Sequence, residues 1–136
     1  MDFNLNANRC IICSPDHPHG IHAQFSGSDG IAHTEVTLGD SWQGFTGMVQ
    51  GGIITGLLDD AMWYAIFGAH QMTTVTAEIT VRFIRPVLIA KPIAVTGRVV
   101  RNRRRLQDTS GELTQEGQLC AVATGRFMPK RGSMDP

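Results

Sequence analysis

The sequence predicts a single α+β domain in which one long helix covers a mainly antiparallel sheet of about five to six strands. Residues 47–67 form a nearly all-apolar segment, which is typical of a buried helix. Two strand-like segments precede it and four follow it. Four consecutive alternating strands cannot all be parallel without long crossovers, so we expect an antiparallel meander whose apolar face is covered by the helix.

The chain before the helix contains two short strand-like stretches, at residues 21–26 and 31–38. A Gly-Ser-Asp-Gly turn sequence at 27–30 separates them and predicts a β-hairpin. Residues 1–20 are expected to form an N-terminal loop segment.

Four strand-like segments follow the helix, which is expected to end near Gly68 and Gln71. Residues 93–99, 106–114 and 117–128 have strand-like patterns, and the tail over 129–136 is polar and expected to fray. The first of the four segments, residues 74–83, alternates cleanly. Val75, Ala77, Ile79, Val81 and Phe83 lie on one face, and Thr74, Thr76, Glu78, Thr80 and Arg82 lie on the other.

Composition excludes several classes of protein. Twelve basic and twelve acidic residues cancel, so the net charge gives no steering toward nucleic acid and favours self-association. No basic N-terminal segment leads into an apolar stretch, so we expect neither a signal peptide nor a membrane span. Three cysteines are too few for a disulfide framework, which agrees with a reducing compartment and a cytoplasmic location.

Two carboxylates, Asp59 and Asp60, stand inside the apolar helical segment. A buried charge costs several kcal/mol unless it is paired, hydrogen-bonded or facing a wet cleft, so these are the first candidates for chemistry. At about 100° per residue, Asp59 shares one side of the helix with Thr55 and Trp63. Asp60 is the alternative if the register differs by one residue.

The segment over residues 47–59 resembles the signature of a known family. It has two glycines, six mostly apolar residues and an aspartate, similar to the His-Gly-Gly and Asp signature of hotdog-fold acyl-CoA thioesterases of the phenylacetate-degradation type, including the 4-hydroxybenzoyl-CoA thioesterase-like branch. Residues 10–21 resemble the Cys-x-x-Cys-Gly and Asn-Pro-x-Gly-Leu start of one branch, and residues 82–87 resemble the strand after the helix. The resemblance covers about residues 10–128 and implies one hotdog domain over 1–136.

The resemblance implies hydrolysis of an acyl-CoA or aryl-CoA thioester in a homodimer or a dimer of dimers. Amides in the first turn of a helix have no intrahelical partner, which suits Gly51, supported by Gly52, as oxyanion donor. By resemblance, Asp59 of one protomer faces the oxyanion site of the other as general base or nucleophile. The alternatives are glycines that only allow close packing and an Asp59 hydrogen-bonded at an interface without catalysis.

One residue departs from the family pattern, because Gln50 replaces the histidine before the two glycines. Glutamine can orient a substrate or the backbone but cannot transfer a proton near neutral pH. A non-catalytic acyl-CoA binder or sensor is therefore the second candidate function. A hotdog enoyl-CoA hydratase or dehydratase is less favoured, since that chemistry typically relies on a histidine.

Other residues are candidates for substrate contacts. Arg101, Arg103 and Arg104 are expected either to bind coenzyme A phosphates or to form a solvated hairpin end. Thr55 and Trp63 are expected near the acyl group, with Phe45 and Phe67 as further possible walls or ordinary core residues.

We expect no metal and no cofactor other than the CoA thioester substrate. Cys10 and Cys13 followed by His17 and His19 offer four zinc ligands, but the histidines crowd the second half-site. Packing of an N-terminal loop near the substrate entrance is the favoured interpretation, and Cys120 is expected to pack in a strand.

Overall fold

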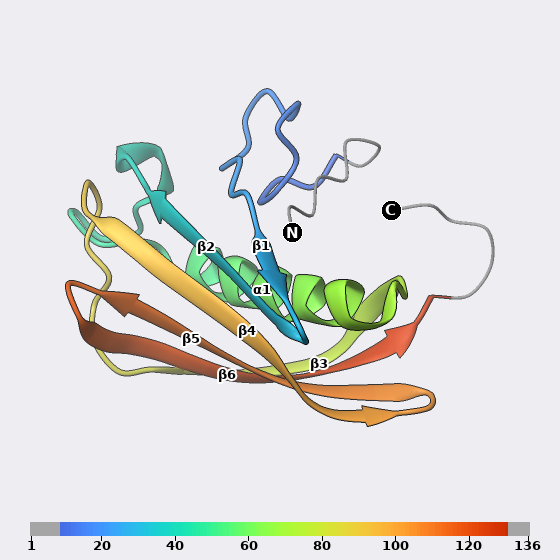
Figure 1. The fold of residues 1–136 in the computed structure, drawn as a ribbon. Helices are drawn as coiled ribbons and strands as arrows, with labels where there is room; N and C mark the ends of the chain where they lie inside the picture. Colours follow the sequence, from blue (N-terminus) through green and yellow to red (C-terminus); the bar gives the residue numbers. More distant parts are fainter. Residues whose placement is uncertain (1–8, 131–136) are drawn as a thin grey trace.

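The computed structural model describes residues 9–130, and in it one long helix lies along one face of a six-stranded antiparallel sheet (Figure 1). This confirms the predicted fold class. In chain order the elements are β1 (Ser26–Ser28), β2 (Ile31–Thr37), the 3-10 helix η1 (Asp40–Trp42), α1 (Gly51–His70), β3 (Thr74–Phe83), β4 (Pro92–Arg103), β5 (Leu106–Gln115) and β6 (Gln118–Pro129).

The strand order in the sheet is β1-β2-β4-β5-β6-β3, and all neighbours are antiparallel. The predicted meander of four strands is therefore correct for β4, β5 and β6 but wrong for β3. The chain crosses from β3 to β4 over residues 84–91, so β3 pairs only with β6 and forms one edge of the sheet. Sequence alternation identifies a strand but does not determine its neighbour.

The first hairpin is shorter than predicted. β1 begins at Ser26, and two of the preceding residues bond the N-terminal segment instead: the Ile21 amide donates to the Ile11 carbonyl and the Ala23 amide to the Ile12 carbonyl, both at 2.8 Å. The turn between β1 and β2 places Asp29 and Gly30 at φ values of 56° and 78°. Positive φ at both positions matches the twist of a two-residue hairpin turn.

The helix starts at Gly51, four residues after the start of the predicted segment 47–67, and ends at His70, between Gly68 and Gln71 as expected. The preceding residues are held outside the helix, since the Val49 amide donates to the Val87 carbonyl at 2.8 Å and Gly47 has a φ of 84°. At the other end Gln71 adopts the left-handed conformation, with a φ of 53°. None of the helices within residues 9–130 combines the length and apolar character needed to cross a bilayer.

A bulge between Thr76 and Glu78 interrupts the alternation predicted for β3. Thr76 hydrogen-bonds a helix side chain, and beyond the bulge Ile79 and Val81 pack against the core. Val75 is exposed, which is opposite to the prediction. The extra residue moves the inward face from odd to even positions in the first part of the strand.

Helix α1 packs closely on the middle of the sheet because small residues lie beneath it. Gly97 of β4 pairs with Gly111 of β5, which pairs with Ala123 of β6, giving a row across three strands. A Cβ added at Gly97 would lie 2.3 Å from the Ala61 carbonyl oxygen of the helix. Larger side chains complete the core on both sides of this row, among them Phe127, Leu57, Leu58, Met62, Ile66, Ile93 and Leu113.

Candidate active site on helix α1

Asp59 lies on the side of α1 that faces the β3 edge. Its Oδ1 accepts a hydrogen bond from the Thr76 hydroxyl at 2.7 Å, and the side chain is half-buried. Burial raises the pKa of the Asp59 carboxyl, while the Thr76 hydrogen bond lowers it. Among the described residues Asp59 has no ion-pair partner, so a single hydroxyl orients an otherwise unpaired carboxylate.

The first turn of α1 leaves one amide available. The Gln50 Oε1 accepts from the Gly52 amide at 2.6 Å and from the Ile53 amide at 3.2 Å, so Gln50 caps the helix. Within the described residues, no hydrogen bond uses the Gly51 amide. Of the two glycines singled out in the sequence, the Gly51 N–H is therefore available to a ligand, whereas the Gly52 N–H is bonded to Gln50.

Gly51 and Gln50 line a groove of about 600 Å³ between the loop before α1 and the segment that follows β3. Its wall includes Phe45, which is 83% exposed, and Phe83, which is 54% exposed. The groove is thus apolar and open to solvent beside an unpaired amide, an arrangement that suits an apolar acyl group with a carbonyl at one end.

Two groove residues were not singled out in the sequence as candidates for a site. Phe83 approaches Gly51, since a Cβ there would contact the phenyl ring at 3.6 Å. Arg85 also lines the groove, and its guanidinium donates to the Leu119 carbonyl at 2.9 Å. Phe83 is the last residue of β3, and its approach to Gly51 depends on how that strand lies against the helix start. Arg85 lies in the segment after β3, for which the sequence contains no periodic signal.

The Asp59 carboxylate and the Gly51 amide do not meet within one chain. They are eight residues apart on one helix, which corresponds to about 12 Å along its axis. The structure therefore does not bring these two sequence-predicted groups together in a single protomer.

Asp60 points to the other side of α1, toward the N-terminal segment. Its Oδ2 accepts a hydrogen bond from the Cys10 thiol at 3.1 Å, and burial raises the pKa of the Asp60 carboxyl well above its usual range. Consecutive residues on a helix point about 100° apart, so only one of the two aspartates faces the β3 edge. It is Asp59, which bonds Thr76 of β3.

The other candidate residues on α1 contact backbone in this protomer. The Thr55 hydroxyl donates to the Gly51 carbonyl at 2.9 Å, and the Trp63 indole donates to the Thr74 carbonyl at 2.8 Å. Trp63 also stacks on Phe67, with ring centroids 5.4 Å apart. Of the three aromatic side chains considered as acyl-pocket walls, Phe45 lies at the groove, while Trp63 and Phe67 pack near the C-terminal half of α1.

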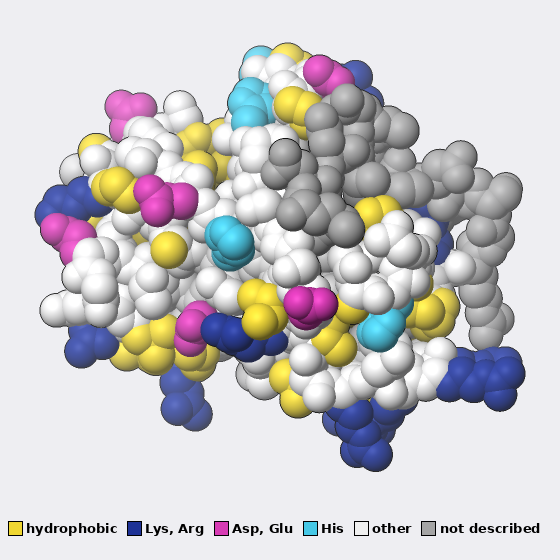
Figure 2. All heavy atoms as spheres, in the orientation of Figure 1, with side chains coloured by type: hydrophobic (Ala, Val, Ile, Leu, Met, Phe, Trp, Pro, Cys, Tyr) yellow, Lys and Arg dark blue, Asp and Glu magenta, His cyan; other side chains and the backbone are white. Residues whose placement is uncertain are grey.

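The arginine cluster lies at the β4–β5 hairpin, near the His70 end of α1 and away from Gly51 (Figure 1). Arg101 and Arg104 are exposed, while Arg103 pairs with Asp108 at 3.1 Å. Figure 2 shows Lys and Arg side chains projecting along the lower margin of the molecule, where the sheet lies in Figure 1. Within one protomer the arginines are thus separate from the groove.

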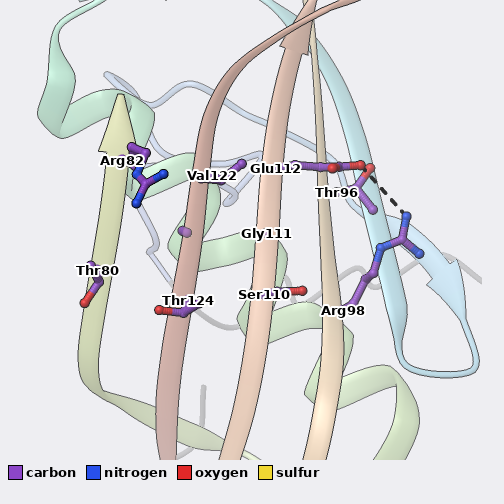
Figure 3. A pocket seen from close by; sticks show the side chains of 10 residues that line it. Thr80, Arg82, Thr96, Arg98, Ser110, Gly111, Glu112, Val122 and Thr124 are labelled. Atoms are coloured by element: carbon purple, nitrogen blue, oxygen red, sulfur yellow. Dashed lines mark ion pairs between the residues drawn. The ribbon is translucent and has the colours of Figure 1, made fainter. Parts of the chain in front are cut away.

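A second depression, of about 520 Å³, lies on the face of the sheet away from α1 (Figure 3). Its charged side chains include Arg98 and Glu112, whose closest N and O atoms are 3.9 Å apart. Hydroxyl groups of Thr80, Ser110 and Thr124 line the rest. It lacks the unpaired helix amide and the aspartate that mark the α1 site, so we place the candidate active site on α1.

Residues 46–122 match the family model of the thioesterase superfamily. A solved thioesterase superfamily protein is 28% identical, with a TM-score of 0.80 over 86% of this chain and 61% of its own. The chain thus spans about three fifths of that relative.

Two further solved structures are similar. A phenylacetic acid degradation-related protein of Ralstonia eutropha is 25% identical, with a TM-score of 0.73 over 79% of this chain and 85% of its own. The protein smu.793 of Streptococcus mutans, solved bound to acetyl CoA, is 17% identical, with a TM-score of 0.75 over 79% of this chain and 88% of its own. No curated protein sequence matches the chain.

The family match covers more than half of the 136 residues and includes the whole of α1. The structural matches extend over most of the antiparallel sheet around that helix. The chain therefore has the hotdog fold and belongs to the thioesterase superfamily.

Proposed function

We propose that this chain hydrolyses an acyl-CoA or aryl-CoA thioester, as a homodimer or a dimer of dimers. The observation that carries the proposal is the unpaired Gly51 amide at an open apolar groove. The acetyl CoA bound to the structurally similar smu.793 supports a CoA thioester as the ligand class. Because these arginines are separate from the groove within one protomer, we assign Arg101, Arg103 and Arg104 of a neighbouring protomer to the coenzyme A phosphates.

In the proposed reaction, Asp59 either takes a proton from water or attacks the thioester itself. In the first route, the water oxygen bonds to the thioester carbonyl carbon as Asp59 accepts the proton. The Gly51 N–H stabilises the negative charge that develops on the carbonyl oxygen. The C–S bond then breaks, the proton passes to the departing sulfur, and the free acid and coenzyme A leave.

The two groups must come from different protomers, because about 12 Å of helix separates them in one chain. The β3 edge, next to Asp59, supports such an assembly. β3 is ten residues long, it pairs only on its β6 side among the described strands, and Val75 on it is 41% exposed. A long unprotected edge strand favours pairing with a second copy.

The role of the Gly51 amide can be tested with a matched pair of variants. Gly51→Pro removes the N–H at the first helical position, where proline is favoured, and Gln50 already has the extended conformation, φ −65° and ψ 138°, that precedes proline. Gly51→Ala keeps the N–H. We expect Gly51→Pro to lower kcat by about 100-fold or more relative to Gly51→Ala, measured as free thiol release over a panel of acyl-CoAs.

The shared site can be tested by mixing inactive chains. Asp59→Asn alone should lower turnover by about 100-fold or more, whereas Glu35→Gln, at an exposed position of β2, should not. When Asp59→Asn and Gly51→Pro chains are unfolded and refolded together, one of the two sites in each heterodimer is intact. Random pairing then restores about a quarter of the wild-type activity.

Three results would contradict this proposal. They are an absence of thiol release by the wild-type protein, equal activity of the Gly51→Pro and Gly51→Ala variants, and no recovery of activity on mixing. Loss of turnover in Asp60→Asn with full turnover in Asp59→Asn would move the catalytic role to Asp60.

A second candidate is a non-catalytic acyl-CoA sensor using the same groove. It is favoured by Gln50, whose side chain caps the helix and cannot transfer a proton near neutral pH. Calorimetry separates the two functions, because a sensor binds intact acyl-CoA saturably and releases no thiol.

A further inference from the structure

A cluster of metal-ligating atoms lies on a different side of α1 from Asp59. The Cys10 Sγ, the Cys13 Sγ and a carboxylate oxygen of Asp60 all lie within 4.8 Å of one another. Cys13 is buried, and Cys10 and Asp60 are half-buried. His17 and His19, the other candidate ligands in the sequence, do not belong to this cluster.

The backbone around the cysteines has the hydrogen bonds that orient thiolate ligands. The Cys13 amide donates to the Cys10 Sγ at 3.2 Å, and the Ser14 amide donates to the Cys10 carbonyl at 2.9 Å, closing a tight turn. The Tyr64 hydroxyl lies next to the Cys13 thiol. Such contacts hold metal ligands in place and reduce the charge on the sulfurs.

The turn is also fixed against the rest of the protein. The amides of Ile21 and Ala23 bond to the carbonyls of Ile11 and Ile12, so the residues between the two cysteines pair with a second segment. The Ile12 side chain packs on α1 at Gly56, where an added Cβ would lie 2.9 Å from it. The ligand positions therefore exist without any rearrangement of the helix.

We propose that Cys10, Cys13 and Asp60 bind one Zn²⁺ ion, with the fourth position open to water. Zinc accepts two thiolates and a carboxylate in tetrahedral geometry. At ordinary zinc–ligand lengths the two sulfurs lie about 3.8 Å apart and each sulfur about 3.6 Å from the oxygen. The Cys10 Sγ to Asp60 Oδ2 distance of 3.1 Å needs to open by only about half an ångström when the bridging proton leaves.

A cation also fits the charge of the cluster. No Lys, Arg or His forms an ion pair with Asp60 among the described residues. Two thiols and a carboxylate, which are all acidic groups, share one largely buried space. A thiolate-rich set favours zinc over magnesium or calcium, which prefer oxygen ligands. The ion would fasten the N-terminal segment to α1 at the residue after Asp59, about 100° around the helix from it.

The test uses the full chain, reduced and freed of metal by a chelator. Titration with Zn²⁺ against a chromophoric chelator should give one ion per chain, and the melting temperature should rise with added zinc. Co²⁺ as a probe should give thiolate-to-cobalt charge-transfer absorption together with the ligand-field bands of a tetrahedral site. The cobalt spectrum reports sulfur ligation directly in the wild-type protein, so it does not depend on whether a variant folds.

Variants assign the ligands. Cys10→Ser, Cys13→Ser and Asp60→Asn should each lower zinc affinity by at least about 100-fold, and Tyr64→Phe by about 10-fold, since loss of outer contacts alone costs 10- to 100-fold. Cys120→Ala and His19→Ala are the matched controls and should retain wild-type affinity. An absence of zinc binding by the reduced chain would overturn the proposal. So would a cobalt spectrum without charge transfer, or affinity unchanged in Asp60→Asn.

Discussion

The close approach of α1 to β4 can be tested by a single methyl group at Gly97. In Gly97→Ala the added Cβ would lie 2.3 Å from the Ala61 carbonyl oxygen and 2.4 Å from its carbonyl carbon. Both atoms are backbone, so no rotamer change relieves the contact, and the helix must move by about 1 Å.

The expected loss of stability follows from this displacement. Overpacking of a core costs about 1–3 kcal/mol, and a contact between backbones belongs at the upper end. The alanine recovers about 0.7 kcal/mol by restricting the unfolded chain, which leaves a loss of about 2 kcal/mol. With an unfolding entropy of about 2.1 cal/mol/K per residue over 136 residues, the melting temperature should fall by about 7 °C.

Calorimetry at one fixed protein concentration measures this shift. Gly39→Ala is the control, because nothing lies within 4 Å of its added Cβ and the φ of Gly39 is −86°. It should leave the melting temperature unchanged or slightly raised. If Gly97→Ala melts within about 2 °C of Gly39→Ala, the helix does not rest on β4 as described.

Two further substitutions test the site around Asp59 and Gly51. Thr76→Val removes the hydroxyl that bonds Asp59, so kcat for thiol release should fall by about 10-fold, whereas Thr76→Ser should retain it; equal kcat in both would exclude an orienting role. Gln50→Ala removes the side-chain cap of α1 and should lower the unfolding free energy by about 1 kcal/mol, measured by urea denaturation. An unchanged urea midpoint would show that the cap adds no stability.

Much of the fold could be predicted from the sequence because its signals are local. The apolar run at 47–67 identified α1, and the alternating segments identified the strands after it. The side of the helix occupied by Asp59 also followed from local geometry, since residues four and eight apart share a face. Thr55 and Trp63 flank it along that face as predicted.

What the sequence could not reveal depends on contacts between distant segments. The bulge in β3 turns Thr76 toward Asp59, seventeen residues earlier. The alternation of side chains along a strand does not predict where a bulge lies. The approach of Cys10 to Asp60 spans fifty residues and depends on where the N-terminal segment crosses the helix. The late start of α1 depends on Gln50. Its side-chain oxygen accepts hydrogen bonds from amides of the first turn, which have no intrahelical backbone acceptor.

The exposed phenyl ring of Phe45 at the groove has a consequence for how the protein behaves on dilution. The Phe45 side chain is 83% exposed to solvent, so covering it with a second protomer or an apolar ligand lowers the free energy. Mass action then links folding to assembly, so the temperature of unfolding should climb as the solution becomes more concentrated. A single melting point for this molecule has meaning only beside the concentration at which it was recorded.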